Sequence, residues 1–177
     1  MEESAEVERR ASRVRLLLLD CDGVLTDGRI TPVEGGEELK SFHTHDGHGL
    51  VMLHRAGLRS GIISGRKSRL VELRAADLGV SFVRQGALDK IEVFENLLAE
   101  AGVEPNHAAY VGDDVVDIPL MRRCALGIAV ADATPDTRAA AHHVTRLPGG
   151  AGAVREVCEL ILKAQGRWDE LMTRYLA

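Results

Sequence analysis

Acidic, hydroxyl and lysine side chains lie at or near the ends of short apolar runs at four separate places in the chain. These side chains are Asp20 and Asp22, Ser64, Lys90, and Asp113 with Asp114. A carboxylate attacks phosphorus readily only when cations and hydrogen-bond donors offset the negative charge of the phosphate oxygens. Carboxylates, a hydroxyl group and a lysine together supply these parts. The residue types therefore predict phosphoryl transfer, provided that the fold brings them together.

The two acids of the first group are separated by one residue in the stretch DCDG. Alternate side chains of an extended chain point to the same side, so Asp20 and Asp22 face one way while Cys21 faces the other. Neighbouring carboxylates repel each other unless a cation lies between them. Carboxylate oxygens are the ligands that hard divalent cations prefer, so this stretch predicts a site for Mg2+.

Six short apolar runs predict strands, at residues 14–19, 58–63, 80–83, 108–111, 126–130 and 143–145. Helical spacing of apolar residues marks 46–56, with Asp46 as its cap, then 68–78, 87–101 and 153–164, and shorter helices run through Leu120 and from Pro135. Strands that alternate with helices indicate an α/β fold, a Rossmann-like parallel sheet with helices on both faces. Such a sheet brings the carboxyl ends of its strands to one edge, where ligands bind. We therefore expect the four groups to meet there.

The segments outside this pattern are a hairpin and the two ends of the chain. Gly35 and Gly36, between two short mixed segments, predict a small β-hairpin flap that projects from the sheet edge. The length of 177 residues fits one domain, 1–177, with a polar lead-in at 1–13 and a tail at 167–177. The tail holds Trp168 and Tyr175, and it either packs back on its own domain or reaches a neighbouring subunit.

The composition argues against several classes of protein. The 22 Lys and Arg residues are outnumbered by 27 Asp and Glu, and a net charge of −5 disfavours nucleic acid as a partner. The opening MEESAEVERRAS is charged, unlike a signal peptide, and no apolar run approaches the roughly 18 residues of a membrane span. The three cysteines are isolated in sequence, as in proteins of reducing compartments. We expect a cytoplasmic protein without a nucleic-acid or membrane partner.

Four motifs, in order, resemble those of the haloacid dehalogenase superfamily of phosphatases: DCDGVLTDG, IISGRK, QGALDK and VGDDVVD. The stretches FHTHDGHG, VADATP and PGGAGAVREVCELILKAQGRWDE are similar to its family of 3-deoxy-D-manno-octulosonate 8-phosphate phosphatases. The resemblance covers nearly the whole chain after about residue 14. It implies an enzyme that uses Mg2+ to release inorganic phosphate from this phosphorylated sugar acid, in lipopolysaccharide precursor synthesis.

The resemblance also implies the roles of the acids. Asp20 would be the nucleophile that forms an aspartyl-phosphate. Asp22 would protonate the leaving sugar oxygen and then activate the water that hydrolyses the intermediate. The Asp20 carboxylate, the backbone carbonyl of Asp22 and Asp113 would hold Mg2+, and Asp114 would lie next to these ligands.

The phosphate and the sugar would be bound by other residues. Ser64 and Gly65 would donate hydrogen bonds to the phosphate, and Lys90 would pair with it and with Asp20. Ser64 also suits the cap of the following helix, a role compatible with phosphate binding. We expect the sugar acid to contact Arg66, His45 and Asp46.

One residue departs from the family pattern: His45 stands where the octulosonate phosphatases usually have an arginine. Arginine is the natural partner of a sugar carboxylate, whereas histidine is only partly charged at pH 7. Arg66, Lys67 or Arg69 would supply the missing charge, or the substrate is a related acid such as a nonulosonate 9-phosphate. A zinc site at the nearby histidines is a further hypothesis, which their spacing does not favour.

Short intervals between the motifs leave no room for the cap domain that many superfamily members carry. Residues 22–46 hold only the hairpin, and residues 64–90 hold one helix and one strand. We therefore expect no cap domain and an open site that a partner subunit closes. The resemblance implies a homotetramer with the hairpin at the subunit interface and the C-terminal tail near a neighbouring active site.

Two other classes of protein use similar residues. A receiver-type signalling domain also forms an aspartyl-phosphate with Mg2+, but its first strand ends in adjacent acids, and the phosphorylated aspartate lies on a later strand. A phosphatase-like assembly module without activity has no need of the intact set of catalytic residues. The spaced DCD at the start and the GDD late in the chain favour the phosphatase.

Overall fold

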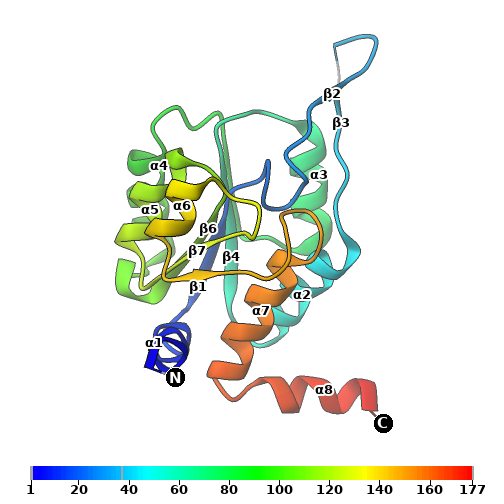
Figure 1. Cartoon of the computed structure of the whole chain (residues 1–177). Coiled ribbons are helices and arrows are strands. Elements are labelled where there is room, and N and C mark those ends of the chain that lie inside the picture. The colour runs from blue at the N-terminus through cyan, green and yellow to red at the C-terminus, as the bar shows by residue number, and fades with distance from the viewer. Residues whose placement is uncertain (1, 37, 177) are drawn as a thin grey trace.

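The structure, a computed structural model, describes residues 2–36 and 38–176. In this part of the chain, parallel strands form a six-stranded sheet in the order β5-β4-β1-β6-β7-β8 (Figure 1). Their bounds are β1 Leu16–Leu19, β4 Arg59–Ser64, β5 Phe82–Gln85, β6 Ala108–Gly112, β7 Leu126–Ala129 and β8 His143–Val144. All six predicted strands are present.

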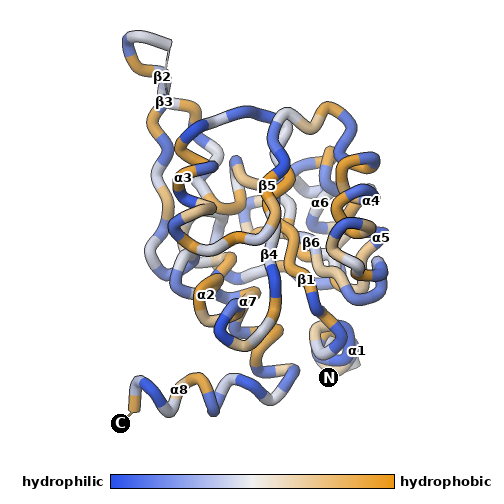
Figure 2. The backbone as a smooth tube through the Cα atoms, turned by 180° about the vertical axis from the view of Figure 1, so that it is seen from behind, coloured by the Kyte–Doolittle hydropathy of each residue, from blue (hydrophilic) through white to orange (hydrophobic). Residues whose placement is uncertain are grey.

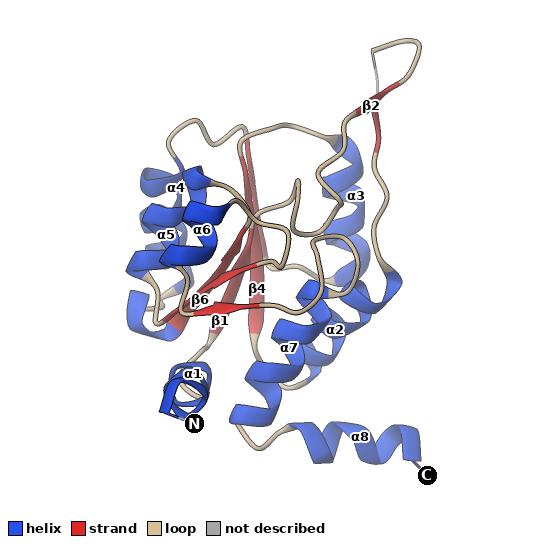
Figure 3. Ribbon diagram, in the orientation of Figure 1, coloured by secondary structure: helices blue, strands red, loops and turns tan. Residues whose placement is uncertain are grey.

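Helices cover both faces of this sheet (Figure 3). One face carries α2 Thr44–Arg55, α3 Arg69–Leu78 and α7 Ala153–Ala164, and the other carries α4 Lys90–Ala101, α5 Ile118–Arg123 and α6 Pro135–Ala140. The remaining elements are α1 Glu2–Ala11, α8 Trp168–Leu176, the 3-10 turns η1 Pro105–His107 and η2 Val115–Asp117, and the antiparallel pair β2 Thr31–Pro32 and β3 Glu38–Leu39. The predicted Rossmann-like fold is confirmed, and the described residues between the motifs contain no cap domain.

Strand β1 lies in the middle of the sheet because its four leucines are fully buried on both faces. It pairs with β4 and β6, so that Leu19 lies opposite Ile62 on one side and Val111 on the other. The chain first extends the sheet through β4 and β5, and then returns to add β6, β7 and β8. The order therefore reverses at β1, which places a ligand crevice beyond its carboxyl end.

Among the predicted boundaries that shift, two do so because helix ends take up backbone groups. The third strand begins at Phe82 and not at Val80, since the Val80 N–H donates to the Ala75 carbonyl at 2.9 Å and completes the end of α3. Helix α4 begins at Lys90 because Asp89 caps it, accepting hydrogen bonds from the N–H groups of Ile91 and Glu92.

Both ends of the chain form helices that pack on the domain. The lead-in forms helix α1, in which Val7 and Ala11 are buried. Helix α8 alternates hydrophobic and hydrophilic residues (Figure 2), and its Trp168 lies beneath the charged groups of Arg155 and Lys163 on α7. The tail thus contacts its own domain, one of the two predicted arrangements. None of the helices in the described part of the chain combines the length and apolar character needed to cross a membrane.

Candidate active site

Three aspartates gather at the carboxyl ends of the central strands. Asp20 follows β1, Asp113 follows β6 and Asp117 ends η2, and one carboxylate oxygen of each lies within 4.8 Å of the others. Among the residues that the structure describes, no other group of three His, Cys, Asp or Glu side chains lies so close. We call these three residues the acidic cluster.

Lys90 supplies a positive charge to this cluster. Its Nζ atom lies 3.1 Å from Asp20 Oδ1 and 2.8 Å from Asp117 Oδ1. Lys90 is the first residue of α4, so the cap at Asp89 also fixes where this side chain starts. The pairing of Lys90 with Asp20 that the sequence predicted is present in the structure.

The acidic cluster carries more negative charge than Lys90 can offset. Burial raises the pKa of Asp20 to about 6, and the charge of Asp117 adds to this effect while Lys90 opposes it. Burial, with the charges of Asp20 and Asp117, raises the pKa of Asp113 to about 7. Carboxylates held in this state favour the binding of a further cation.

Asp113 has the least satisfied carboxylate of the three. Its Oδ1 atom is buried and accepts no hydrogen bond. Gly23, with φ of +92°, lies so close that a Cβ atom there would overlap the Asp113 carboxylate. The glycine after the DCD stretch therefore lets the first loop approach Asp113. An unpaired buried oxygen that faces two other acids is what a metal ligand requires.

Asp117 is a residue for which the sequence analysis gave no role. Its Oδ1 accepts a hydrogen bond from the Tyr110 hydroxyl at 2.9 Å as well as the contact from Lys90. Its Oδ2 accepts from the backbone N–H groups of Asp113 at 3.1 Å and Asp114 at 3.4 Å. The signal in the sequence was the three-residue spacing of Asp114 and Asp117, which forms a capping box.

Asp114 does not occupy the place predicted for it beside the metal ligands. It is exposed, and its carboxylate accepts a hydrogen bond from the Val115 N–H at 2.7 Å as the cap of η2. The buried neighbour of Asp20 and Asp113 is Asp117 instead. The tight turn directs the Asp114 side chain towards solvent and that of Asp117 inwards.

The Asp22 side chain points to a different set of partners. Its Oδ1 forms an ion pair with Lys40 Nζ, and its Oδ2 lies 3.6 Å from Arg66 Nε. Glu38 joins the two cations, with Oε1 at 3.2 Å from Lys40 Nζ and Oε2 at 2.6 Å from Arg66. We call these four residues the flap network, and residues 29–43 the flap. The hairpin projects as predicted (Figure 1), but its base also contacts Asp22, which the sequence analysis did not predict.

Ser64 ends β4 next to β1, and it is buried. Its hydroxyl accepts a hydrogen bond from the Arg66 N–H at 3.3 Å within the loop. The helix that follows starts only at Arg69, so Ser64 does not cap it. Gly65 and Arg66 are exposed beside Ser64. The loop therefore presents a hydroxyl, backbone groups and a guanidinium together.

The sequence predicted that Asp46 and His45 contact the substrate. The structure argues against this contact for Asp46 and gives no support for it at His45. Asp46 is 1% exposed and accepts hydrogen bonds from the N–H groups of Gly152 at 3.2 Å and Arg155 at 2.8 Å. It therefore caps α7 and not α2, whose cap is His43, and its burial excludes the predicted contact with substrate. We call Asp46 and the start of α7 the Asp46 junction. His45 is exposed and packs edge-on against His43, with ring centroids 4.9 Å apart.

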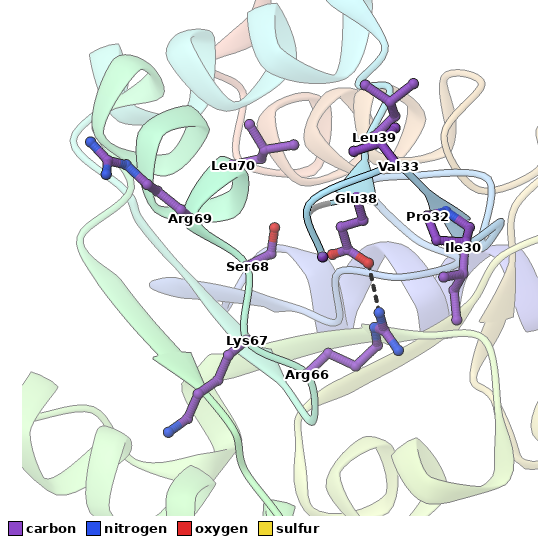
Figure 4. A pocket seen from close by; sticks show the side chains of 11 residues that line it. Ile30, Pro32, Val33, Glu38, Leu39, Arg66, Lys67, Ser68, Arg69 and Leu70 are labelled. Carbon is purple, nitrogen blue, oxygen red and sulfur yellow. Dashed lines mark hydrogen bonds and ion pairs between the residues drawn. The ribbon is translucent and has the colours of Figure 1, made fainter.

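A hollow of about 540 Å³ lies between the flap and the start of α3 (Figure 4). Arg66, Lys67 and Arg69 line one side, and apolar residues of the flap line the other. Figure 4 shows the contact between Arg66 and Glu38 at its edge. Arg66 therefore places positive charge at the edge of the hollow close to Asp22, whereas the charged ends of Lys67 and Arg69 point away from it (Figure 4).

The loop at residues 148–152 packs against the loop that follows Asp22. The Gly150 N–H donates to the Val24 carbonyl at 2.9 Å, and a Cβ atom at Gly149 would overlap the Gly23 carbonyl. Residues 148–152 thus pack directly on the loop between Asp22 and the flap. The glycine-rich stretch after β8 can approach the loop after Asp22 this closely because Gly149 and Gly150 have no side chains.

The chain is similar to known proteins along most of its length. The family model for haloacid dehalogenase-like hydrolases matches residues 52–155. The chain is 48% identical, over 94% of its length and 89% of the relative, to 3-deoxy-D-manno-octulosonate 8-phosphate phosphatase KdsC of Escherichia coli K12.

Two solved structures are also similar. One is a probable YrbI family phosphatase from Pseudomonas syringae, with TM-score 0.96, 46% identity and 98% of each chain covered. The other is the octulosonate 8-phosphate phosphatase of Moraxella catarrhalis in complex with magnesium, phosphate and KDO, with TM-score 0.94 and 41% identity over 96% of this chain and 98% of that one. The protein therefore belongs to the family of haloacid dehalogenase-like hydrolases.

Proposed function

We propose that the protein is a Mg2+-dependent phosphatase that hydrolyses 3-deoxy-D-manno-octulosonate 8-phosphate to the free sugar acid and inorganic phosphate. The observation that carries the proposal is the acidic cluster with Lys90 at the end of β1, in which Asp20 is held by a single cation. The relatives that bear this activity in their names match the chain along nearly its whole length.

The proposed reaction has two steps. The Asp20 carboxylate attacks phosphorus, the bond from phosphorus to the sugar oxygen breaks, and that oxygen takes a proton from Asp22. Asp22 then removes a proton from water, which attacks the aspartyl-phosphate and releases inorganic phosphate and free Asp20. Lys90 orients Asp20 and pairs with the phosphate, and Ser64 and Gly65 donate hydrogen bonds to it.

The acidic cluster fits Mg2+ by its donor set and by the unpaired Oδ1 atom of Asp113. The Asp20 carboxylate, Asp113 and the backbone carbonyl of Asp22 would hold the ion. Both oxygens of Asp117 already accept two donors each, so Asp117 orients Lys90 and Asp113 and does not bind the ion itself. When bound, the ion supplies charge that offsets the phosphate oxygens.

The hollow beside the flap suits the sugar acid. Arg66 lies 3.6 Å from Asp22 and would meet the carboxylate of the substrate, and Lys67 and Arg69 would have to turn towards the hollow to add their charge. His45 is the alternative contact that the family pattern suggests. Selection for a carboxylate-bearing sugar follows from this charge.

We also propose a homotetramer in the cytoplasm, acting in lipopolysaccharide precursor synthesis, with each tail near a neighbour's active site. Helix α8 lies at the end of the domain opposite the flap (Figure 1), so the tail of one chain is remote from its own acidic cluster. Light scattering of the purified protein measures the mass of the assembly. A truncation after residue 166 that remains fully active, or a monomer with full activity, would contradict the role of the tail.

The test of the reaction is phosphate release with and without Mg2+ from a panel of sugar phosphates. We expect the highest kcat/KM for octulosonate 8-phosphate, and a low value for hexose 6-phosphates, which lack the carboxylate. A higher value for a nonulosonate 9-phosphate would reassign the substrate. A long-lived phosphoprotein without turnover would indicate a receiver-type domain, and no reaction with any phosphate would indicate an assembly module.

A further inference from the structure

The flap reaches the candidate acid/base residue through one buried lysine. The Lys40 side chain is only 2% exposed, although it comes from a hairpin that projects away from the domain (Figure 1). It forms an ion pair with Asp22 Oδ1 and lies 3.2 Å from Glu38 Oε1. Burying an ammonium group is costly unless it is paired, so these two carboxylates determine where the lysine lies.

The flap network restrains both oxygens of Asp22. Lys40 contacts Oδ1, and Arg66 lies 3.6 Å from Oδ2. Glu38 in turn contacts Lys40 and Arg66, so the two cations are themselves linked. When Asp22 is ionised, as it is when it acts as the base, the charges of the two acids and the two cations cancel. Their contacts join the end of β1, the flap and the loop after β4 into one closed ring.

The lysine stays charged within this ring. The carboxylates of Asp22 and Glu38 offset the cost of burying its ammonium group. Lys40 donates a hydrogen bond to Asp22, and its contact with Glu38 Oε1 is an ion pair. Glu38 and Lys40 are two residues apart, so both side chains leave the same face of the hairpin, the face that meets the sheet edge.

We propose that Lys40 is a positioning residue, which holds the Asp22 carboxylate where it transfers protons and ties the base of the flap over the site. The inference rests on the proposed function and extends it to a residue of the flap. Proton transfer requires its donor within hydrogen-bond reach of the reacting oxygen, and it contributes about 100-fold or more to rates. If the Asp22 side chain is free to turn away from the reacting oxygen, part of this rate enhancement is lost.

The experiment compares Lys40→Met with wild type, using octulosonate 8-phosphate and 4-nitrophenyl phosphate. Methionine keeps a flexible apolar stem and removes the charge. We expect kcat for the sugar phosphate to fall by about tenfold or more, with KM nearly unchanged. Nitrophenolate leaves without a proton, so its first release stays fast while hydrolysis of the aspartyl-phosphate slows. The variant should therefore show a burst of nitrophenolate in rapid mixing.

Two further variants make the comparison specific. Arg29→Gln removes another flap cation, one that pairs with Asp27 at 3.7 Å and contacts no member of the flap network, and we expect wild-type kinetics from it. Lys40→Arg restores the charge and should recover most of the lost rate. A Lys40→Met protein that behaves like Arg29→Gln, or one in which only KM rises, would overturn the proposal.

A measurement that needs no turnover separates this inference from the proposed function. In a crystal structure of Lys40→Met we expect the Asp22 side chain to leave its present orientation. Amide hydrogen exchange in the flap should become faster than in wild type. An Asp22 side chain and a flap that remain unchanged would overturn the role of Lys40, whichever sugar phosphate the wild-type enzyme prefers. If the wild-type protein hydrolyses no sugar phosphate but Lys40→Met shows these structural changes, only the proposed substrate would be overturned.

Discussion

The acidic cluster and the Asp46 junction both bury aspartate, but they treat its charge in opposite ways. Asp46 stands alone and accepts hydrogen bonds from two backbone N–H groups at the start of α7. The acidic cluster brings three carboxylates together and gives them one lysine, and Asp113 keeps an oxygen without a partner. Burial of an acid therefore does not by itself mark an active site. The mark is charge that the protein leaves unmatched.

Removal of the proposed nucleophile should have the largest effect on activity. It should also distinguish the acidic cluster most clearly from the Asp46 junction. We expect Asp20→Asn to lower kcat by roughly 10^4-fold or more. The same change removes one of three like charges, so the metal-free variant should unfold at a higher temperature than wild type. Phosphate release and thermal unfolding measure the two effects. A variant with full turnover would refute the aspartyl-phosphate scheme, and Asp27→Asn, at an exposed site, is the control.

Metal binding should depend on pH in the acidic cluster. The pKa values of Asp20 and Asp113, raised to about 6 and about 7, mean that the folded metal-free protein binds protons more tightly than the unfolded chain. This stabilisation is complete below about pH 4 and is lost as the pH rises through 6 and 7. Mg2+ competes with these protons. At a concentration a hundred times its Kd, Mg2+ should raise the free energy of unfolding by about 2.7 kcal/mol at pH 8 and by less at pH 5.

Calorimetry at the two pH values, with and without Mg2+, measures that difference. Equal gains at both would contradict a metal site built from these acids. The Asp20→Asn variant supplies a second comparison, because it should lose much of the gain at pH 8.

Loss of the carboxylate at the Asp46 junction should affect stability and not chemistry. Asp46→Ala leaves the N–H groups of Gly152 and Arg155 without their acceptor, at a cost of about 1 to 2 kcal/mol. Denaturant unfolding measures this cost, and KM should stay at the wild-type value because Asp46 is buried. A raised KM with unchanged stability would restore the substrate contact that the sequence suggested.

Tyr110→Phe should give the smallest effect within the acidic cluster. It removes one of the two side-chain donors to Asp117 Oδ1, worth about 1 kcal/mol. Lys90 is then the one side chain that still contacts Asp117 Oδ1, and we expect kcat to fall by about tenfold or less. Steady-state kinetics and unfolding in denaturant together measure the change. Unaltered kcat would show that Asp117 holds Lys90 without help from the hydroxyl.

The sequence predicted the sheet and the meeting of Asp20, Lys90 and Asp113, because parallel strands must end at one edge. It failed where a side chain's direction depends on contacts between distant segments. Asp46 reaches the start of α7, more than a hundred residues away, and no local pattern encodes that contact. The direction of Lys40 depends on how the hairpin lies against the sheet. Asp117 was recognisable in principle, since its spacing from Asp114 is that of a capping box.

The packing of residues 148–152 against the first loop has a consequence for the addition of new segments to this fold. Gly149 and Gly150 leave no space between the two loops, so an insertion at residues 23–28 would push the catalytic acids off the end of β1. The tip of the flap is different, because nothing lies within 4 Å of where side chains at Gly35 and Gly36 would begin. The hairpin tip should therefore tolerate a grafted lid, added by design or by gene fusion within the chain, better than residues 23–28 would.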